Sequence, residues 1–478
     1  MLLIAVLNVQ LSAQEGSALE TATAMERLVT EAIEKAEKSV VAIARVRREK
    51  DAPAREPEDL ALPPFPLDRD VGPTDPKFVP NEFGTGVVID AKGLIVTNYH
   101  VIGDVRGADY YVWLARKPYA AKVKAADPWL DLAVLQIEAE NLQPITFGDG
   151  RAVKKGQFVI ALGNPYAIAR DGQPSAAWGI VSNLQRQAPA PKGGTRPSEG
   201  RETLHHWGTL IQTDAKLEFG ASGGALVNLK GEMIGLTTSL AALFGYERPG
   251  GFAIPIDDDF RRALDTLKTG RLPDYGFLGV APRTLAMSDR QKGRFGAAIE
   301  DIVPATPAAA AGLKSGDIIT HVDGRQVFDD IDLIRHVSAL PADFQVMLSI
   351  QRGSRKMQTP VKLSKKRLEG PRPGYAEVPP QTWRGLRVEY ATAAPLFRDQ
   401  SRDLDPEGCV GVIEVERDSP AWKAGLRPGD FVSHVEKTRV ATPQQFYDAV
   451  GLIEGEAKLQ LTAVDADKSQ RIVPAAAP

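Results

Sequence analysis

The sequence predicts a mainly β protein in which a barrel or sandwich of short strands is followed by two small tandem domains. Its 478 residues are enough for about three domains at the usual 100–200 residues each. Between residues 84 and 255, short apolar runs alternate with glycine-rich turns, which is typical of an all-β barrel or sandwich and not of a parallel α/β sheet. The C-terminal half then contains one motif twice, at a constant spacing of 113 residues that relates Gly312 to Gly425.

The composition excludes several classes of protein. Hydrophobic residues make up 43% of the chain and charged residues 25%, as in ordinary globular proteins. The formal net charge of −3 provides no diffuse basic field, so nucleic acid is not an expected partner. Cys409 is the single cysteine, which excludes a disulfide-stapled fold and a zinc ribbon, and it is expected to pack as a small hydrophobic residue.

The N-terminal residues 1–13 are apolar and end in a pair of small residues, Ser12-Ala13. A membrane-spanning helix needs about 20 apolar residues, and no stretch of the chain approaches that length. Residues 1–13 are therefore predicted to be the remnant of a signal peptide that lacks its basic start, with a buried N-terminal segment as the alternative. The mature protein is expected to be periplasmic or otherwise exported, without a stable membrane span.

Local patterns predict the elements of the first domain in order. Apolar residues from Met25 to Ala36 recur at helical spacing, and residues 40–44 favour a strand. Residues 51–82 carry eight prolines and are predicted to form a long surface loop. A hairpin is expected at residues 87–96, and further strands at residues 132–135, 159–162 and 225–227.

The turn from Gly220 to Gly224 contains a candidate nucleophile, Ser222. A serine hydroxyl becomes reactive when a neighbouring base takes its proton and a third group orients that base. The glycines around Ser222 allow the backbone N–H groups of Gly220 and Ser222 to converge as an oxyanion hole. Taken alone, the same residues also fit a plain glycine-rich turn.

His100 and Asp131 are the candidate base and orienting carboxylate. His100 follows a strand-like run and would, alone, be interpreted as a structural histidine, whereas Asp131 precedes an apolar run and needs a buried partner. The order His100, Asp131, Ser222 is that of chymotrypsin-like proteases. An α/β-hydrolase elbow requires a helix after the serine and the order Ser, Asp, His, so that interpretation fails.

The C-terminal repeat predicts two domains of the same kind. Pro307 to Asp317 recurs as Pro420 to Asp430 in the same register. Two copies are too few for a solenoid, so separate domains are expected at residues 275–365 and 383–475. The charged, proline-rich residues 366–382 between them predict a semi-rigid linker.

Several ordered motifs together resemble the HtrA (Deg) family of serine proteases. They are Thr97-Asn98-Tyr99-His100-Val101-Ile102, Asp131-Leu132-Ala133-Val134-Leu135, Leu162-Gly163-Asn164-Pro165-Tyr166, Ile211-Gln212-Thr213-Asp214-Ala215, Gly220 to Gly224 and Gly251-Phe252-Ala253-Ile254-Pro255. The two repeats resemble the PDZ domains that follow the protease domain in this family. The resemblance implies a chymotrypsin-like double β-barrel over residues 20–265, followed by two PDZ-like α+β domains.

The resemblance also implies a function. It implies ATP-independent endoproteolysis of unfolded or damaged exported proteins, in homotrimers or multiples of trimers and without a cofactor, and the chain contains no Gly-Lys dipeptide for a Walker A loop. His100 would be the general base, Asp131 its orienting group and Ser222 the nucleophile. The chain departs from the family at Ala221 and Ala225, where asparagine and proline are usual, and at residues 218–219, where Asn-Pro is usual.

Peptide binding is expected in the first PDZ-like domain. Residues 276–280 resemble a carboxylate-binding loop, so Phe277, Leu278 and Gly279 would hold the C-terminal carboxylate of a peptide. In the second domain Arg384 replaces the usual apolar residue, which leaves both peptide binding and a purely architectural role open. His205 and His206 are expected on opposite sides of a strand, so no metal site is predicted there.

Two other functions remain open on the sequence alone. A proteolytically inactive chaperone or scaffold would bind unfolded chains or C-terminal peptides through its PDZ-like domains, and Ala221 and Ala225 support it. An esterase would use the same three residues on small esters. A fluorophosphonate probe separates the first alternative from a protease, because labelling of Ser222 requires an activated hydroxyl.

Overall fold

The computed structural model describes residues 2–48, 75, 82–164, 173–188, 203–218, 220–238, 251–368, 373–462 and 470–475, with side chains from residue 18 onward. The chain divides into two units. One comprises Met1–Leu272 with Gly370–Glu377, and the other Pro273–Glu369 with Val378–Pro478. The predicted proline-rich loop 51–82 lies outside the described residues, apart from Asp75 and the start of a strand at Glu82.

The first unit begins with a single helix, α1 (Leu2–Ala36), which includes the helix predicted from Met25. The short turn η1 (Glu37–Ser39) then leads into β1 (Val40–Arg47), which confirms the strand expected at residues 40–44. Among the described residues, no helix is both long enough and apolar enough to span a membrane. The signal peptide at residues 1–13 stays a prediction.

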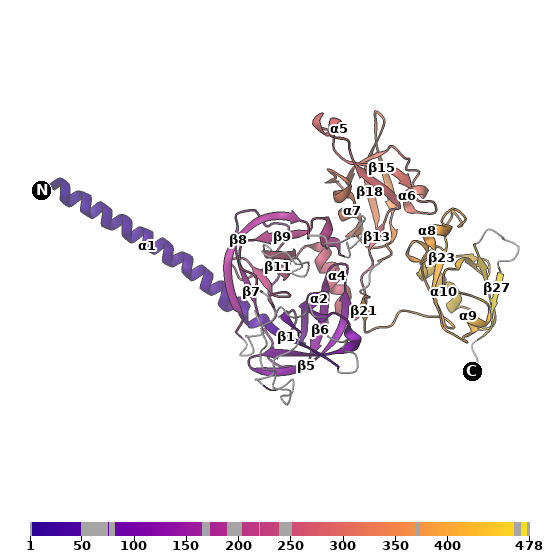
Figure 1. The fold of residues 1–478 in the computed structure, drawn as a ribbon, viewed down its shortest axis with the longest axis horizontal. Coiled ribbons are helices and arrows are strands. Elements are labelled where there is room, and N and C mark those ends of the chain that lie inside the picture. The colour runs from indigo at the N-terminus through magenta and orange to yellow at the C-terminus, as the bar shows by residue number, and fades with distance from the viewer. Residues whose placement is uncertain are drawn as a thin grey trace, which may run out of the picture. The chain divides into compact units, whose positions relative to one another are not determined.

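Six strands close the first barrel (Figure 1). Neighbouring strands pair in the order β5-β4-β1-β2-β3-β6, and the pairing of β5 with β6 closes the barrel. The predicted hairpin is present, with Val87 opposite Val96 across β2 and β3. Side chains that alternate along the strands, such as Val41 and Ile43, fill the interior. The strands are β1, β2 (Glu82–Val88), β3 (Leu94–Thr97), β4 (Ala108–Leu114), β5 (Lys117–Asp127) and β6 (Leu132–Ile137).

A second closed barrel follows, in the order β10-β11-β12-β9-β8-β7. Its core contains Val159, Val181, Ile211, Leu226 and Ile234. The two barrels confirm the predicted chymotrypsin-like double β-barrel. The strands are β7 (Phe158–Gly163), β8 (Ser175–Arg186), β9 (Leu210–Thr213), β10 (Ala225–Val227), β11 (Met233–Thr238) and β12 (Gly251–Pro255).

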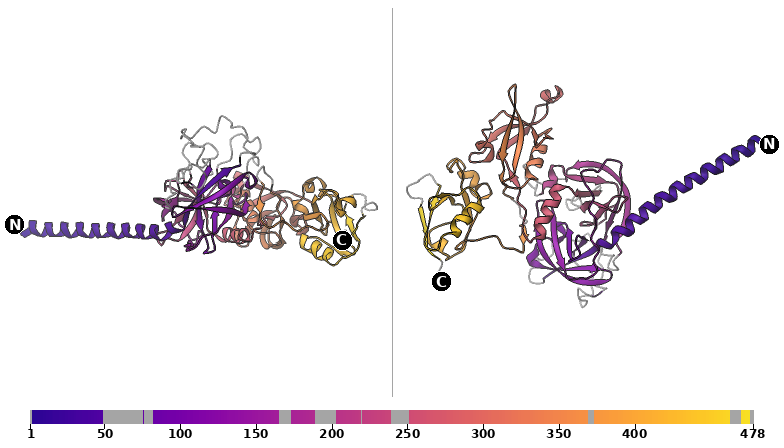
Figure 2. Two further views of the ribbon diagram at one scale, coloured as in Figure 1. Left: turned by 90° about the horizontal axis from the view of Figure 1, so that it is seen from below. Right: turned by 180° about the vertical axis from the view of Figure 1, so that it is seen from behind.

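Helix α4 (Asp258–Lys268) packs against β5 and β6 of the first barrel (Figures 1 and 2). The Asp257 carboxylate caps it by accepting the N–H of Phe260 at 2.9 Å. Its buried face carries Phe260, Ala263, Leu264 and Leu267 at helical spacing. The helix thus covers β5 and β6, the two strands on either side of Asp131 in the sequence.

Part of the predicted linker is a strand of the first barrel, which corrects the expectation for residues 366–382. β21 (Tyr375–Ala376) pairs antiparallel with β5, with Tyr375 opposite Ala126. Next to it, the Tyr99 hydroxyl donates to the Pro373 carbonyl at 3.0 Å. A two-residue strand has no periodicity to detect. It forms because β5 pairs with β4 only as far as Ala121, so the backbone of β5 near Ala125 and Ala126 is open to a further strand on that side.

The second unit contains two domains of one topology, which confirms the interpretation of the repeat. The first pairs β13 with β20 and has a sheet in the order β14-β15-β16-β18-β19, with β17 beside β16. Its elements are β13 (Gly276–Phe277), β14 (Val280–Thr284), α5 (Met287–Gln291), β15 (Ala297–Ile302), α6 (Pro307–Ala310), β16 (Ile318–Val322), β17 (Arg325–Gln326), α7 (Asp330–Ser338), β18 (Gln345–Arg352), β19 (Arg355–Lys362) and β20 (Ser364–Lys365).

The second domain repeats this sheet as β22-β23-β24-β26-β27, with β25 beside β24. Cys409 is 3% exposed in a small cluster with Phe397 and Phe431, which confirms its role in packing. Burial raises the pKa of its thiol to about 12. The elements are β22 (Leu386–Tyr390), α8 (Phe397–Gln400), β23 (Val410–Val415), α9 (Pro420–Lys423), β24 (Phe431–Val435), β25 (Thr438–Arg439), α10 (Pro443–Gly451), β26 (Ala457–Leu461) and β27 (Gln470–Val473).

Candidate functional site

His100 and Asp131 are in direct contact, as the sequence predicts. The short helix α2 (Tyr99–Ile102) after β3 carries His100, whose Nδ1 lies 2.8 Å from Asp131 Oδ2. The backbone N–H of His100 also donates to Asp131 Oδ1 at 3.0 Å. An ionised carboxylate only accepts hydrogen bonds, so Nδ1 carries the ring proton and Nε2 is left as the proton acceptor.

Asp131 is held rigidly by its backbone as well as by its side chain. It is only 2% exposed and has a φ of +54°, a left-handed conformation that aspartate tolerates better than most residues. Its carbonyl accepts the N–H of Tyr99 at 3.1 Å and the side-chain amide of Asn98 at 3.2 Å. Asn98 was not predicted as a site residue, although it lies in the motif that contains His100.

Ser222 lies in a tight turn of the second barrel that is bonded to β2 of the first. The N–H of Gly224 donates to Ala221 at 3.2 Å to close the turn, and the Ser222 carbonyl accepts the N–H of Thr85 at 2.8 Å. The Thr85 hydroxyl donates to the Gly220 carbonyl and accepts the N–H of Asn164, both at 2.7 Å. The fully buried Thr85 therefore joins the turn of Ser222 to the barrel that carries His100 and Asp131.

The turn can form only with glycine at two of its positions. Gly223 has a φ of +84°, and a Cβ there would lie 2.0 Å from the Thr85 carbonyl oxygen. Gly220 has a φ of +94°, and a Cβ there would lie 2.6 Å from the Asn164 carbonyl oxygen. Both positions combine a left-handed backbone with a collision, so the glycine-rich pattern around Ser222 has a steric cause.

The N–H groups of three turn residues already have backbone acceptors. Ala221 donates to Glu218 at 3.0 Å, Gly223 to Thr237 at 2.9 Å and Gly224 to Ala221. These three groups are therefore occupied in this structure. The predicted oxyanion-hole residues, Gly220 and Ser222, lie in the same turn.

The two alanines that depart from the family pattern are packing residues here. Ala221 is 6% exposed, and its carbonyl accepts the Thr237 hydroxyl at 2.5 Å. Ala225 is fully buried in β10, between Leu162 of β7 and Leu236 of β11. The turn is thus bonded to β11 as well as to β2. Phe219, the second residue of the pair 218–219 that also departs from the family pattern, lies outside the described residues.

His205 and His206 lie in a 3-10 turn, η7 (Leu204–Trp207), and not in a strand, which corrects that prediction. Both imidazoles are buried and bonded to backbone carbonyls: His205 Nε2 to Leu130 at 2.9 Å and His206 Nδ1 to Ala188 at 3.2 Å. The turn ends at Gly208, which has a φ of +82°. Nowhere among the described residues do three or more potential metal ligands cluster.

The predicted carboxylate-binding loop of the first PDZ-like domain is anchored through its carbonyl groups. The Leu278 carbonyl accepts the N–H of Ala308 and the Gly279 carbonyl that of Val303, each at 2.9 Å. Within the described part of the chain, no group accepts the N–H of Leu278 or of Gly279. Phe277 is in β13, paired with Ser364.

The arginine in the corresponding loop of the second domain, Arg384, bonds to segments outside that loop. The Arg384 guanidinium donates to the carbonyls of Ile453 at 3.2 Å, Val473 at 3.2 Å and Pro474 at 2.8 Å. Trp383 and Leu386 exchange two backbone hydrogen bonds of 2.8 Å. The Arg384 side chain therefore ties the C-terminal strand to the loop, which favours the architectural role.

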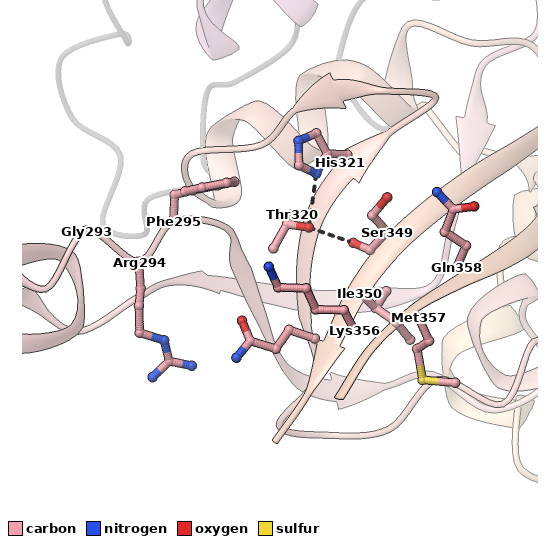
Figure 3. Close-up of a pocket in the computed structure, with 11 residues that line it drawn as sticks. Gly293, Arg294, Phe295, Thr320, His321, Ser349, Ile350, Lys356, Met357 and Gln358 are labelled. Atoms are coloured by element: carbon pink, nitrogen blue, oxygen red, sulfur yellow. Dashed lines mark hydrogen bonds between the residues drawn. The ribbon is translucent and has the colours of Figure 1, made fainter. Parts of the chain in front are cut away.

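A separate hollow of about 670 Å³ lies on the first PDZ-like domain, against β16, β18 and β19 (Figure 3). Figure 3 shows Thr320 between His321 and Ser349. His321 Nδ1 lies 3.1 Å from the Thr320 hydroxyl, which donates to the Ser349 carbonyl at 3.1 Å. The sequence did not predict this hollow, and none of its lining residues belongs to the loop 276–280.

Family profiles match all three predicted domains. A profile described as "Trypsin-like peptidase domain" matches residues 84–236, and profiles described as "PDZ domain" match residues 276–363 and 411–462. Among solved structures, the serine endoprotease from Yersinia pestis is 25% identical over 70% of this chain and 97% of that chain, with a TM-score of 0.45.

Curated relatives extend the similarity over most of the chain. A DegP-like periplasmic serine endoprotease of Chlamydia trachomatis is 31% identical over 379 residues, which cover 78% of this chain and 70% of the relative. Another of the same description, from Halomonas elongata, is 32% identical over 382 residues, covering 77% of this chain and 73% of the relative. The chain therefore belongs to the HtrA (Deg) family, and it is a periplasmic or otherwise exported serine endopeptidase with a trypsin-like domain and two PDZ domains.

Proposed function

We propose that His100, Asp131 and Ser222 are the catalytic triad of an ATP-independent endoprotease that degrades unfolded or damaged exported proteins. The observation that carries this proposal is the contact of the part-buried His100 with the buried Asp131, with Nδ1 2.8 Å from the carboxylate. This pair leaves Nε2 as the base, in the arrangement that serine proteases require. The glycine-rich turn that is bonded to the same barrel through Thr85 supplies the nucleophile.

The chemistry follows from these groups. His100 Nε2 takes the proton of Ser222 as the hydroxyl oxygen attacks the scissile carbonyl carbon, and the N–H groups of Gly220 and Ser222 stabilise the oxyanion. The imidazolium then donates its proton to the leaving amine, which departs as the acyl-enzyme forms. Asp131 stays ionised and stabilises the imidazolium throughout. Water hydrolyses the acyl-enzyme by the same proton transfers, which need neither ATP nor a cofactor.

We further propose that the first PDZ domain captures C-terminal peptides and thereby regulates the protease. The loop N–H groups of Phe277, Leu278 and Gly279 would bind the carboxylate while the peptide adds a strand at the sheet edge. The carbonyls of Leu278 and Gly279 bond inward, which supports this orientation. The second PDZ domain would be architectural, and the full chain would assemble as a homotrimer or a multiple of trimers.

The experiment that tests this function is degradation of casein, an unfolded protein, by the purified full chain without ATP. We expect the parent to fragment casein and Ser222→Ala to lose at least about a thousandfold in rate, because the nucleophile is absent. Ser433→Ala, which changes another buried serine in the second PDZ domain, is the matched control and should degrade casein at the parent rate. Degradation by Ser222→Ala at the parent rate would overturn the proposal.

A further inference from the structure

His205 is a buried histidine that takes no part in the chemistry proposed above. It is 1% exposed in η7, and both ring nitrogens are bonded. Nε2 lies 2.9 Å from the Leu130 carbonyl, which can only accept, so Nε2 carries the proton. Nδ1 therefore accepts the hydroxyl of Thr209 at 2.6 Å. Burial lowers the pKa of His205 to about 4, so the ring is neutral and keeps this tautomer at neutral pH.

The carbonyl that His205 binds belongs to the peptide group immediately before Asp131. That peptide group includes the nitrogen of Asp131, so its orientation is coupled to the φ angle of Asp131, which is +54°. A left-handed backbone conformation is strained for a residue other than glycine and persists only where the surroundings enforce it. The hydrogen bond from His205 enforces it at one end of the residue, and the bonds from Asn98 and Tyr99 to the Asp131 carbonyl do so at the other.

The rest of η7 supports the same segment. The N–H of Leu204 donates to the Trp129 carbonyl at 2.8 Å, and the rings of Trp129 and Trp207 lie 5.5 Å apart. The Asp127 carboxylate accepts the N–H groups of Trp129 and Leu130 at 3.2 and 3.1 Å. The short turn from the second barrel is therefore bonded to two consecutive carbonyls of the segment that leads to Asp131.

We infer that His205 is a positioning residue, which holds the peptide group before Asp131 so that the carboxylate stays aligned with His100. This inference rests on the proposed function, because it assigns a consequence to the triad. His205 touches neither the substrate nor the reacting atoms. Its effect passes through Asp131, and a small displacement of a catalytic group is enough to lower a rate by about a hundredfold.

Two amide substitutions separate the bond to Leu130 from the bond to Thr209. The side-chain amide nitrogen of glutamine occupies roughly the place of Nε2, so His205→Gln keeps a donor for Leu130. The shorter asparagine places its amide near Nδ1, so His205→Asn reaches Thr209 but not Leu130. His206→Asn is the matched control, because His206 lies in the same turn with similar burial but bonds through Nδ1 to Ala188.

The test measures the rate of fluorophosphonate labelling of the full chain at neutral pH, with kcat and KM for a fluorogenic peptide and the melting temperature of each variant. We expect His205→Asn to label and turn over at least about 10-fold more slowly with KM within about twofold, and His205→Gln and His206→Asn to stay within about threefold of the parent. A parent that neither labels nor cleaves would instead contradict the proposed function.

The inference itself is overturned if the parent is active and His205→Asn labels at the parent rate. It is also overturned if His206→Asn loses as much activity as His205→Asn, because that loss would reflect packing of η7 alone. Should His205→Asn melt below the assay temperature, His205→Gln decides: a folded His205→Gln variant must retain the parent labelling rate, and a loss of 10-fold or more would refute the inference.

Discussion

Thr85 connects the two halves of the candidate site through a single side chain. Its hydroxyl donates to the Gly220 carbonyl and accepts the N–H of Asn164, and its backbone N–H donates to Ser222. All of these groups are in the interior, where a polar group without a partner costs about 1–3 kcal/mol. The position of the proposed nucleophile relative to the first barrel therefore depends in part on this hydroxyl, together with the backbone bond to Ser222.

Thr85→Val removes that hydroxyl and nearly preserves the shape of the side chain. We expect a loss of about 1–3 kcal/mol in the free energy of unfolding, because the N–H of Asn164 loses its acceptor, and a fall in kcat of at least about 10-fold. Urea unfolding and cleavage of a fluorogenic peptide measure the two effects. Thr85→Ser keeps the hydroxyl and is the control; equal activity of the valine and serine variants would contradict this role.

At the residue scale, the sequence predicted the three residues of the proposed triad but not the residues that contact them. His100, Asp131 and Ser222 are recognisable because their chemistry and their order in the chain are specific. Thr85 and His205 are ordinary residue types in a strand and a turn, and their roles depend on contacts across 79 and 75 residues of chain. Such contacts leave no local pattern.

At the scale of elements, strands with clear alternation were predicted well and short irregular elements were not. The hairpin around Asp90, whose carboxylate accepts the N–H groups of Lys92 and Leu94, matches its sequence signal. In contrast, η7 was predicted as a strand and β21 as linker. Both elements are short and are stabilised by tertiary hydrogen bonds, so neither has a periodic sequence pattern that could reveal it. The conformation of residues 204–207 depends on hydrogen bonds to the carbonyls of Trp129 and Leu130, and the local sequence gives no sign of these distant partners.

The loop 276–280 is the element through which the first PDZ domain is expected to bind peptides. Gly279 has a φ of +89°, and a Cβ there would lie 2.3 Å from the Thr306 side chain. Gly279→Ala is therefore expected to displace the loop and to weaken binding of a peptide with a free C-terminal carboxylate by at least about 10-fold. Fluorescence anisotropy of the labelled peptide measures this loss.

Gly312→Ala is the control for that variant. Gly312 has a φ of +67°, but a Cβ there would meet no atom within 4 Å, so the substitution adds backbone strain without a collision. It should leave the affinity for the peptide within about twofold of the parent value. An amidated version of the peptide should bind weakly to every variant, and unchanged affinity of Gly279→Ala for the free carboxylate would exclude this loop as the binding site.

At the scale of the whole molecule, a β region followed by two domains of repeated topology matches the organisation predicted from length, texture and repeat. The double barrel matches the one that the family resemblance implies. The trypsin-like and PDZ profiles match the same three regions. The curated relatives are 30–32% identical over 77–78% of this chain, so the family is established although Ala221 and Ala225 depart from its usual pattern. Both alanines are buried in this fold.

The most direct measurement is fluorophosphonate labelling of the full chain, with the modified residue identified by mass spectrometry. The account predicts that the parent is labelled on Ser222 and that His100→Ala lowers the labelling rate at least about a thousandfold, because the hydroxyl loses its base. A parent that is not labelled, or labelling of Ser222 at the same rate without the imidazole of His100, would contradict the account.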